Sequence, residues 1–414
     1  MISKPLAVLL ACVFAVMIGF GITMPVLPFY VERLAIADGA TRNAVVTHVG
    51  LLTGVYALMQ LVFAPLWGRW SDRIGRRPLI LIGIGGYVAA QILFGLATSL
   101  WLLYAARILG GVLSSATLPV AGAFVSDLTT KEQRSHGMAL LGTAVSLGFV
   151  IGPALGGVLT RTDLHFTARF GHFQIDSFSV PFFAAAAIGL LTLGAALRWL
   201  PESMMSSQAG RSVPAAARPT WRIVARQIGP LLGLSLASQF GLALFEAIFA
   251  LYAKARFNYG PGEVGLAFVV CGLVMTLFQI AGVAVLKGRI GPLYRIATGL
   301  GVMGASLALL VLARNTPVIL TVIAFLALGA AVVSPNVSAM ISEKGGTGHA
   351  GSALGVLNGA NSLGQASGPF LGGALYLWQS HAPFLLTGVL LVVVSLSTAW
   401  ATRRQQAWTA LAVA

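Results

Sequence analysis

Residues 148–157 read Gly-Phe-Val-Ile-Gly-Pro-Ala-Leu-Gly-Gly, and residues 364–373 read Gly-Gln-Ala-Ser-Gly-Pro-Phe-Leu-Gly-Gly. Both copies fit the pattern G-x-x-x-G-P-x-x-G-G, and both lie inside long apolar runs. The triplet Arg-Ile-Gly recurs with the same separation, at 73–75 and 289–291. Two matches at one offset indicate a duplicated and fused unit, and the apolar runs indicate that each half is embedded in lipid.

The composition is that of a membrane protein. Hydrophobic residues make up 57% of the chain and charged residues 9%, and the mean hydropathy is +0.88. A soluble domain carries about 25% charged residues. Apolar runs of roughly 20 residues cross a hydrocarbon core as helices, because lipid leaves each backbone polar group to be paired within its own segment. The runs do not alternate as transmembrane β-strands do, so we predict an all-α membrane protein.

The apolar runs predict about twelve membrane-spanning helices, six in each half, by the ~20-residue criterion. The polar break at 200–228 contains three prolines and four arginines and lies where the two halves meet. We therefore predict a six-helix bundle at 1–199, a cytoplasmic linker at 200–228 and a second six-helix bundle at 229–414. The predicted spans are 6–29, 46–67, 78–98, 100–126, 136–160, 178–199, 229–253, 263–286, 294–313, 316–341, 352–377 and 382–402.

The formal net charge of +15 reflects membrane topology and predicts no nucleic-acid partner. With the N-terminus inside, most of the 26 lysines and arginines fall in cytoplasmic segments, as the positive-inside rule requires. Both termini are therefore expected in the cytoplasm. The first span is too long to be a cleaved signal peptide. Cys12 and Cys271 both lie in predicted spans, so no disulfide and no metal site is expected.

Residues 68–78 form a predicted loop, Gly-Arg-Trp-Ser-Asp-Arg-Ile-Gly-Arg-Arg-Pro. Glycine suits a sharp turn, and the four arginines suit the inner headgroups. Asp72 is an acid among bases and can face a helix N-terminus, which favours an anion by ~0.3–1 kcal/mol. The alternative is a positive-inside loop with one exposed acid.

Two charged residues, Glu246 and Arg107, lie well inside predicted spans and not at their ends. Glu246 is the only one of eleven acids in the middle of a span, where a carboxylate costs ~2.5–3.5 kcal/mol and is functional by default. Desolvation favours its neutral form, which suits a proton carrier or a contact for a cationic substrate. The alternative is a permanently protonated glutamate bonded to a neighbouring helix. Arg107 can bind a substrate acid, take part in proton coupling or tether backbone carbonyls.

The repeated glycine–proline motif has its own physical consequences. Glycines at i and i+4 let two helices approach closely in lipid, and proline bends a helix. We interpret the two copies as a symmetric hinge or seal, with ordinary small-residue packing as the alternative. The motif residues are Gly148, Gly152, Pro153, Gly156 and Gly157, then Gly364, Gly368, Pro369, Gly372 and Gly373.

Polar and aromatic residues within the spans predict a substrate cavity. Aromatic rings on both sides of Glu246 would give an apolar pocket with one acid, which suits a lipophilic cation or a zwitterion. Helix packing or lipid contact is the alternative for these rings. The predicted lining is Gln60, Gln239, Phe240, Phe245, Phe249, Asn358 and Asn361.

Together these motifs resemble the major facilitator superfamily. The loop at 68–78 is similar to its signature G-x-L-A-D-R-x-G-R-[KR], and residues 107–111 are similar to its fourth-helix R-x-x-x-G motif. The glycine–proline motif is similar to the one that marks its drug/proton antiporters. Residues 21–28 and 56–60 resemble the tetracycline exporters, and residues 240–246 resemble the quinolone and multidrug exporters. The resemblance covers essentially the whole chain.

The resemblance implies the major-facilitator fold, with twelve helices in two pseudo-symmetric bundles, and a cytoplasmic latch. Asp72 would meet the N-terminus of the eleventh helix near Gly351, and Arg76 would pair with Asp127 at the end of the fourth span. This latch would stabilise an outward-open state. Its residues are Gly68, Asp72, Gly75, Arg76, Arg77 and Asp127.

The sequence departs from these exporters at four positions. The tetracycline exporters carry acids in the first and third spans, where this chain has Val16 and Ala90. The quinolone exporters carry an acid and an arginine in the tenth span, where this chain has Ala331 and Ser334. These differences argue against metal–tetracycline recognition and against a two-carboxylate relay, so Glu246 is expected to do most of the titrating.

We expect a monomeric, proton-coupled exporter of small amphiphilic or drug-like molecules in a bacterial inner membrane, with no cofactor and no metal. The alternative is a carrier of the same fold for a dedicated solute such as a metallophore, sugar or lipid. A membrane enzyme is not expected, because the six histidines fall at span edges or in loops and no nucleophile–base pair or phosphate-binding loop is visible. A receptor would carry a sizeable soluble module, which is not apparent.

Overall fold

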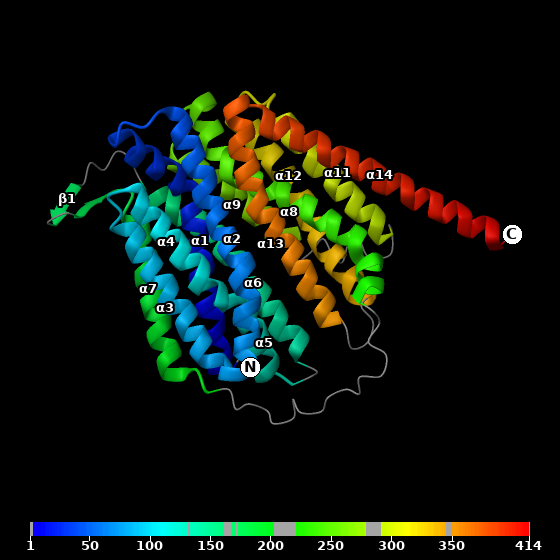
Figure 1. Cartoon of the computed structure of the whole chain (residues 1–414), viewed down its shortest axis with the longest axis horizontal. Helices are drawn as coiled ribbons and strands as arrows, with labels where there is room; N and C mark the ends of the chain where they lie inside the picture. The colour runs from blue at the N-terminus through cyan, green and yellow to red at the C-terminus, as the bar shows by residue number, and fades with distance from the viewer. Residues whose placement is uncertain are drawn as a thin grey trace. The chain divides into compact units, whose positions relative to one another are not determined.

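The structure is a computed structural model that describes residues 3–130, 133–160, 167–170, 173–202, 221–278, 291–344 and 350–413. Helices make up almost all of it (Figure 1). The helices of the first part of the chain are α1 (Lys4–Ala37), α2 (Arg42–Ile74), α3 (Arg76–Gly95), α4 (Leu100–Leu113), α5 (Thr117–Leu128), α6 (Arg134–Leu159) and α7 (Val180–Trp199). Those of the second part are α8 (Trp221–Phe257), α9 (Pro261–Leu277), α11 (Pro292–Leu310), α12 (Thr316–Lys344), α13 (Ala350–Trp378) and α14 (Ala382–Val413).

The predicted all-α membrane fold is confirmed. In the described part of the chain, 10 helices are long and apolar enough to cross a membrane, with α4 and α5 counted as one. With α9 and α13 this makes the 12 helices of the fold. Residues 279–286 of the eighth predicted span lie outside the described residues. Large apolar side chains point outward, such as Leu191 on α7 (76% exposed) and Leu396 on α14 (64% exposed), as lipid-facing surfaces require.

The fourth predicted span, 100–126, is not one continuous helix. A turn of 3₁₀ helix, η1 (Ser114–Ala116), separates α4 from α5. Pro119 lacks a backbone N–H and its ring crowds the carbonyl group four residues earlier, so regular α-helical bonding is interrupted here. The Ser114 hydroxyl donates to the Gly110 carbonyl, and the Trp67 indole donates to the Val112 carbonyl at 2.6 Å. The distortion begins about two turns after Arg107.

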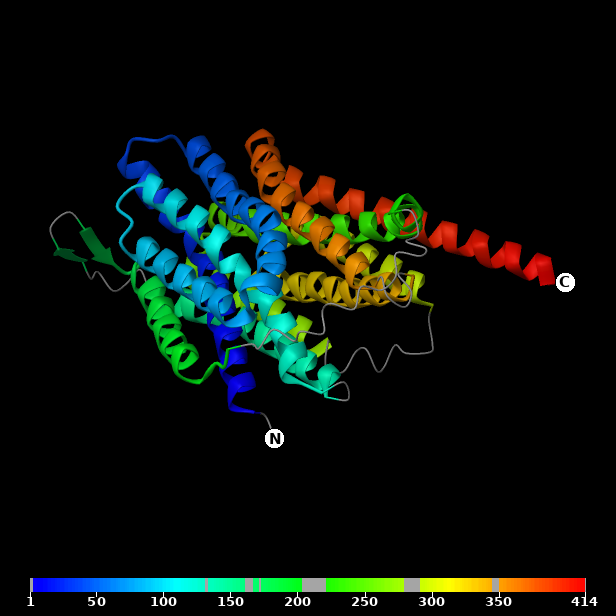
Figure 2. The same ribbon diagram turned by 60° about the horizontal axis from the view of Figure 1, so that its bottom comes forward.

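A short hairpin between α6 and α7 was not predicted. Strands β1 (Thr167–Phe170) and β2 (Phe173–Asp176) pair antiparallel, with Thr167 opposite Asp176. Figures 1 and 2 both show the hairpin projecting beyond the neighbouring helices. The Asp176 carboxylate forms an ion pair with Arg33 near the end of α1 and accepts a bond from the backbone N–H of Phe178 at 2.9 Å. The hairpin is thus anchored to the first helix through one buried acid.

The chain forms two compact units. Unit 1 comprises Met1–Pro214 and Phe249–Gly272, and unit 2 comprises Ala215–Ile248 and Leu273–Ala414. In unit 1 the main packing is of α1 against α6, and of α3 against α4 and α7; in unit 2 it is of α11 against α12 and α14. The division after residue 214 falls in the predicted linker, of which 203–220 lie outside the described residues. The predicted six-helix bundles stay a prediction.

Candidate functional site

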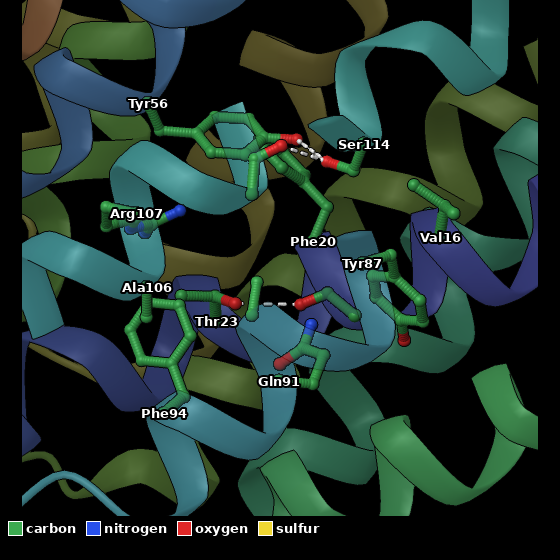
Figure 3. Close-up of a pocket in the computed structure, with 13 residues that line it drawn as sticks. Val16, Phe20, Thr23, Tyr56, Tyr87, Gln91, Phe94, Ala106, Arg107 and Ser114 are labelled. Carbon is green, nitrogen blue, oxygen red and sulfur yellow. Dashed lines mark hydrogen bonds between the residues drawn. The ribbon is translucent and has the colours of Figure 1, made fainter. Parts of the chain in front are cut away.

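A pocket inside unit 1 surrounds the guanidinium of Arg107 (Figure 3). Its walls come from α1, α2, α3, α4 and η1. The rings of Tyr56 and Phe94 lie on the Arg107 side of the pocket, and Gln91 lies on α3 opposite α1. None of the residues that line this pocket is acidic.

Arg107 is a buried cation without an anionic partner in the described part of the chain. The residue is only 6% exposed, and its Nε atom is buried without a hydrogen-bond partner among the described residues. Its Cζ atom lies 5.3 Å from the centroid of the Tyr56 ring and 5.6 Å from that of Phe94. These cation–π contacts stabilise the charge but leave the Nε–H group without a hydrogen bond to any described residue. The expected tether to backbone carbonyls is not formed with any described residue.

Gln91 was not among the predicted cavity residues. It is 5% exposed, and its Oε1 atom has no partner in the described part of the chain. An added Cβ at Gly19 would lie 2.3 Å from Gln91 Nε2, so only glycine on α1 leaves room for this amide. Tyr87 lies one helical turn before Gln91, so the two polar side chains share one face of α3. This i, i+4 spacing is the sequence signal that could have identified Gln91 as a pocket residue. The predicted Gln60 is half-buried on α2 and does not line this pocket.

Val16 and Ala90, the positions at which the resemblance to the tetracycline exporters implies acids, both line the Arg107 pocket. They are 3% and 5% exposed. The Tyr56 hydroxyl lies 3.4 Å from the Ser114 hydroxyl, so these two neutral groups of the pocket bond each other. The result is a pocket in which the one formal charge is positive.

Glu246 lies near the middle of the membrane-spanning part of α8 and is half-buried. It forms no hydrogen bond or ion pair with another residue that the structure describes. The neighbouring Phe245 and Phe249 are fully buried, and the Phe249 ring packs edge-on against Phe268 of α9, with centroids 6.0 Å apart. Phe240 is half-buried. The two rings closest to Glu246 in the sequence are therefore held by packing.

Three of the predicted cavity amides lie in unit 2 and differ in environment. Gln239 Oε1 on α8 accepts a hydrogen bond from Gln365 Nε2 on α13, at 3.3 Å. Asn361 Oδ1 on α13 accepts one from the Ser235 hydroxyl on α8, at 2.6 Å. Asn358 is exposed. Two of the three amides thus join α8 to α13, a common use of polar residues between membrane helices.

The first copy of the glycine–proline motif packs α6 closely against α1. An added Cβ at Gly148 would lie 2.4 Å from Met17 Cβ, and one at Gly152 would lie 2.6 Å from the Ile18 carbonyl oxygen. One at Gly156 would lie 2.8 Å from the carbonyl oxygen of residue 22. Each glycine therefore marks a place where the two backbones meet, as small residues allow in lipid.

Gly157 in the same motif faces a different helix. A Cβ there would lie 3.0 Å from the Pro261 carbonyl oxygen and 3.3 Å from the Cα atom of Gly265, both on α9. A Cβ at Gly265 would lie 2.8 Å from the Pro153 carbonyl oxygen. The motif thus packs against α1 on one side and against α9 on the other, within unit 1.

The second copy of the motif packs α13 against α8 within unit 2. A Cβ at Gly364 would lie 2.7 Å from the Leu236 carbonyl oxygen, and one at Gly368 would lie 2.8 Å from that of Phe240. A Cβ at Gly372 would meet Ile248 Cγ1 at 3.0 Å. Pro153 and Pro369 both lie inside their helices. The two copies therefore perform the same packing task in helices that the duplication relates.

The predicted loop at 68–78 is largely helical, which corrects its boundaries. Gly68 lies inside α2, which runs to residue 74, and α3 begins at residue 76. Lipid limits only the apolar part of a span, so arginines, which favour helices, extend α2 into the polar region. The turn is confined to Gly75, whose φ of +101° favours glycine.

The ion pair that the resemblance implies at the start of α3 is present. Arg76 Nε lies 3.2 Å from Asp127 Oδ2, at the end of α5. The Nη1 atom of Arg77 lies 3.2 Å from Glu202 Oε1, and its Nη2 donates to the Leu197 carbonyl at 2.9 Å. These contacts connect the start of α3 to two other segments of unit 1. The Asp72 side chain lies outside what the structure describes, and its contact with the start of α13 stays a prediction.

Comparisons with known proteins agree with these features. The family model described as the Major Facilitator Superfamily matches residues 9–366 and 231–411. Multidrug resistance protein 2 of Bacillus subtilis (strain 168) is 29% identical over 407 residues, which cover 97% of this chain and 96% of that protein. The class E tetracycline resistance protein of Escherichia coli is 30% identical and covers 90% of this chain and 88% of its own length. The quinolone resistance protein NorA of Staphylococcus aureus (strain COL) is 25% identical, with 95% and 96% covered.

Solved structures show the same fold. A D-xylose–proton symporter superimposes with a TM-score of 0.75 at 16% identity, covering 94% of this chain and 96% of that one. A POT family transporter superimposes with a TM-score of 0.79 at 16% identity, covering 96% of both chains. The glycine–proline motifs, the Arg76–Asp127 pair and the twelve helices agree with these matches. The predicted family is therefore confirmed: the chain belongs to the Major Facilitator Superfamily and is a multi-pass membrane transporter.

Proposed function

We propose that this transporter is a proton-coupled exporter of small amphiphilic, drug-like molecules. Its relatives include proteins named for resistance to several drugs, to tetracycline and to quinolones. We place it in a bacterial inner membrane as a monomer, with both termini in the cytoplasm, binding protons and small molecules without a cofactor. Bundles at 1–199 and 229–414 would move against each other in alternating access.

The observation that carries the proposal is the state of Glu246. A carboxyl group inside a membrane helix is costly and is retained for function. Glu246 is half-buried and has no fixed partner among the described residues, so its proton is not committed to a structural hydrogen bond. A group of this kind can take up a proton when it faces one side of the membrane and lose it to the other.

The energy available from one proton is adequate for export. One pH unit across the membrane corresponds to about 1.4 kcal/mol per proton, which sustains about a tenfold gradient of a neutral substrate. A membrane potential adds to this whenever the exchange moves net charge, by ~2.3 kcal/mol per charge at 100 mV. A single titrating carboxyl group is therefore sufficient for measurable accumulation.

The glycine–proline motifs and the charged residues near the start of α3 support the proposed motion. In unit 1, glycines of α6 pack against both α1 and α9. Because no side chains interlock at these glycines, the helices can separate and pack together again. The Arg76–Asp127 pair lies where the family places its cytoplasmic latch. We assign it the role of stabilising one of the two end states.

The test is transport in proteoliposomes under an imposed pH gradient. Glu246→Gln keeps the size of the side chain but cannot titrate. We expect it to lose gradient-driven accumulation of a fluorescent lipophilic cation while keeping substrate exchange at equal pH, which needs no net proton movement. Glu343→Gln, a change at an exposed glutamate of α12, is the control and should behave as the parent. Accumulation by Glu246→Gln equal to that of the parent would refute the proton role.

A further inference from the structure

The pocket around Arg107 contains an unbalanced charge. Arg107 is 6% exposed, and no acid lines the pocket. A buried charge without a partner is strongly unfavourable, and the rings of Tyr56 and Phe94 compensate only part of it. Such a site is retained when something other than the protein supplies the missing anion.

The unused polar atoms in the pocket match one kind of anion. Arg107 Nε is buried without a partner, and its planar guanidinium is suited to a two-oxygen acceptor. The amide of Gln91, also buried with an unpartnered atom, can donate an N–H when it rotates to exchange its nitrogen and oxygen. A carboxylate would satisfy the arginine and gain a bond from the amide.

The lining of the pocket combines the polar groups with apolar and aromatic surface. Gly19 has no side chain, and the side chains of Gln91 and Tyr87 fill the space beside it, since an added Cβ there would lie 2.3 Å from both. Val16 and Ala90 are short apolar residues at the pocket wall. Phe20 and Phe94 add aromatic surface beside these groups. The arrangement offers a polar end at Arg107 and Gln91, with apolar walls leading to it (Figure 3).

We propose that the Arg107 pocket binds a carboxylate of the transported molecule. The preferred substrates are then amphiphiles with a carboxylate, including zwitterions, and not lipophilic cations alone. This inference rests on the proposed function, since it names the chemical class of the exported molecules. It also explains how the first half of the chain keeps a buried arginine without the acids that the resemblance to the tetracycline exporters implies at positions 16 and 90.

The test uses a matched pair of ligands on the purified full-length protein. A zwitterionic fluoroquinolone and its methyl ester differ by the one negative charge. We expect the acid to bind the parent about tenfold or more tightly than the ester. Arg107→Met should remove this preference while leaving ester affinity within about threefold, and Arg107→Lys should retain part of it because an ammonium group lacks the two-pronged geometry.

Two further variants control the result. Arg256→Met removes another arginine that lies over a tyrosine ring, 5.8 Å from the Tyr252 centroid, but that does not line the pocket. It should keep the full preference for the acid. Gln91→Leu keeps Arg107 and removes the amide, so it should weaken binding of the acid but not of the ester, even if Arg107→Met does not fold.

Equal binding of acid and ester to the parent would overturn the inference, as would a preference that Arg107→Met leaves unchanged. An inorganic anion is the competing source of negative charge. If chloride raises the melting temperature of the parent but not of Arg107→Met, while acid and ester bind alike, the pocket holds an inorganic anion and the inference is wrong.

The same ligands separate this inference from the proposed function. If a pH gradient drives flux of the ester as readily as of the acid, the carboxylate site is refuted and proton-coupled export stands. If the acid binds in an Arg107-dependent way but no gradient drives its flux, proton-coupled export fails and the carboxylate site stands.

Discussion

Replacing Gly152 by alanine tests whether the contact between α6 and α1 holds unit 1 together. The added carbon would lie 2.6 Å from the Ile18 carbonyl oxygen and 2.7 Å from the Cα atom of Gly21. Both neighbours are backbone atoms inside a helix, so neither can turn aside. Comfortable carbon contacts begin near ~3.5 Å, so the two helices must move apart by roughly 0.8–1 Å.

The energetic consequence follows from two opposing effects. Overpacking of this kind costs about 1–3 kcal/mol, whereas replacing glycine by alanine within a helix favours folding by about 1 kcal/mol. Gly142 lies on the same helix, and a Cβ there would have no neighbour within 4 Å. Gly142→Ala therefore isolates the helix-propensity gain, and Gly152→Ala should be less stable than this control by about 1–3 kcal/mol.

Thermal unfolding in detergent measures this difference. The side chains of Cys12 and Cys271 are buried, so a thiol-reactive dye reports their exposure on unfolding. At roughly 2–4 °C per kcal/mol for a large domain, Gly152→Ala should melt several degrees below Gly142→Ala. A melting temperature equal to or above that of Gly142→Ala would refute the close α1–α6 contact, because both variants would then gain from helix propensity alone.

Two further predictions concern packing and charge. Gly368→Ala places a carbon 2.8 Å from two backbone atoms of α8, whereas a Cβ at Gly359 has no neighbour within 4 Å. Gly368→Ala should therefore melt at a lower temperature than Gly359→Ala. Equal melting temperatures would contradict the close packing of α8 against α13. Lys254 Nζ lies 2.6 Å from Glu32 Oε2, with 39% and 17% of the side chains exposed. A double-mutant cycle with Lys254→Met and Glu32→Gln should give a small coupling energy of ~0.2–1 kcal/mol, because solvent screens the pair. A coupling energy of zero at low salt would contradict the ion pair.

Much of the fold follows from local properties that the sequence displays. A run of apolar residues in lipid must be helical, because each backbone group has to be paired within its own segment. The number and positions of the spans could therefore be predicted, as could the need for glycine at residue 75. The break at Ser114–Ala116 was missed, although Pro119 was a visible cause. The hairpin at 167–176 was missed because two four-residue strands give too short a pattern to separate from a loop.

The candidate site was predictable only in part. Glu246 and Arg107 could be identified singly, because a charge within a membrane span is costly wherever it points. The partners of the two groups could not be identified in this way. Gln91 gave no comparable signal, since amides also serve as ordinary contacts between membrane helices, as Gln239 and Asn361 do here.

The sequence by itself indicated a duplicated chain of membrane helices with one carboxyl group and one guanidinium group away from the ends of its spans. Only the tertiary structure decided that Arg107 and Gln91 share one pocket without an acid, and that Gly157 faces α9 while Gly152 faces α1. The physical reason is that helix formation in lipid depends on each segment alone. The rotation of each helix about its own axis, which decides what a side chain faces, depends on packing among segments far apart in the chain.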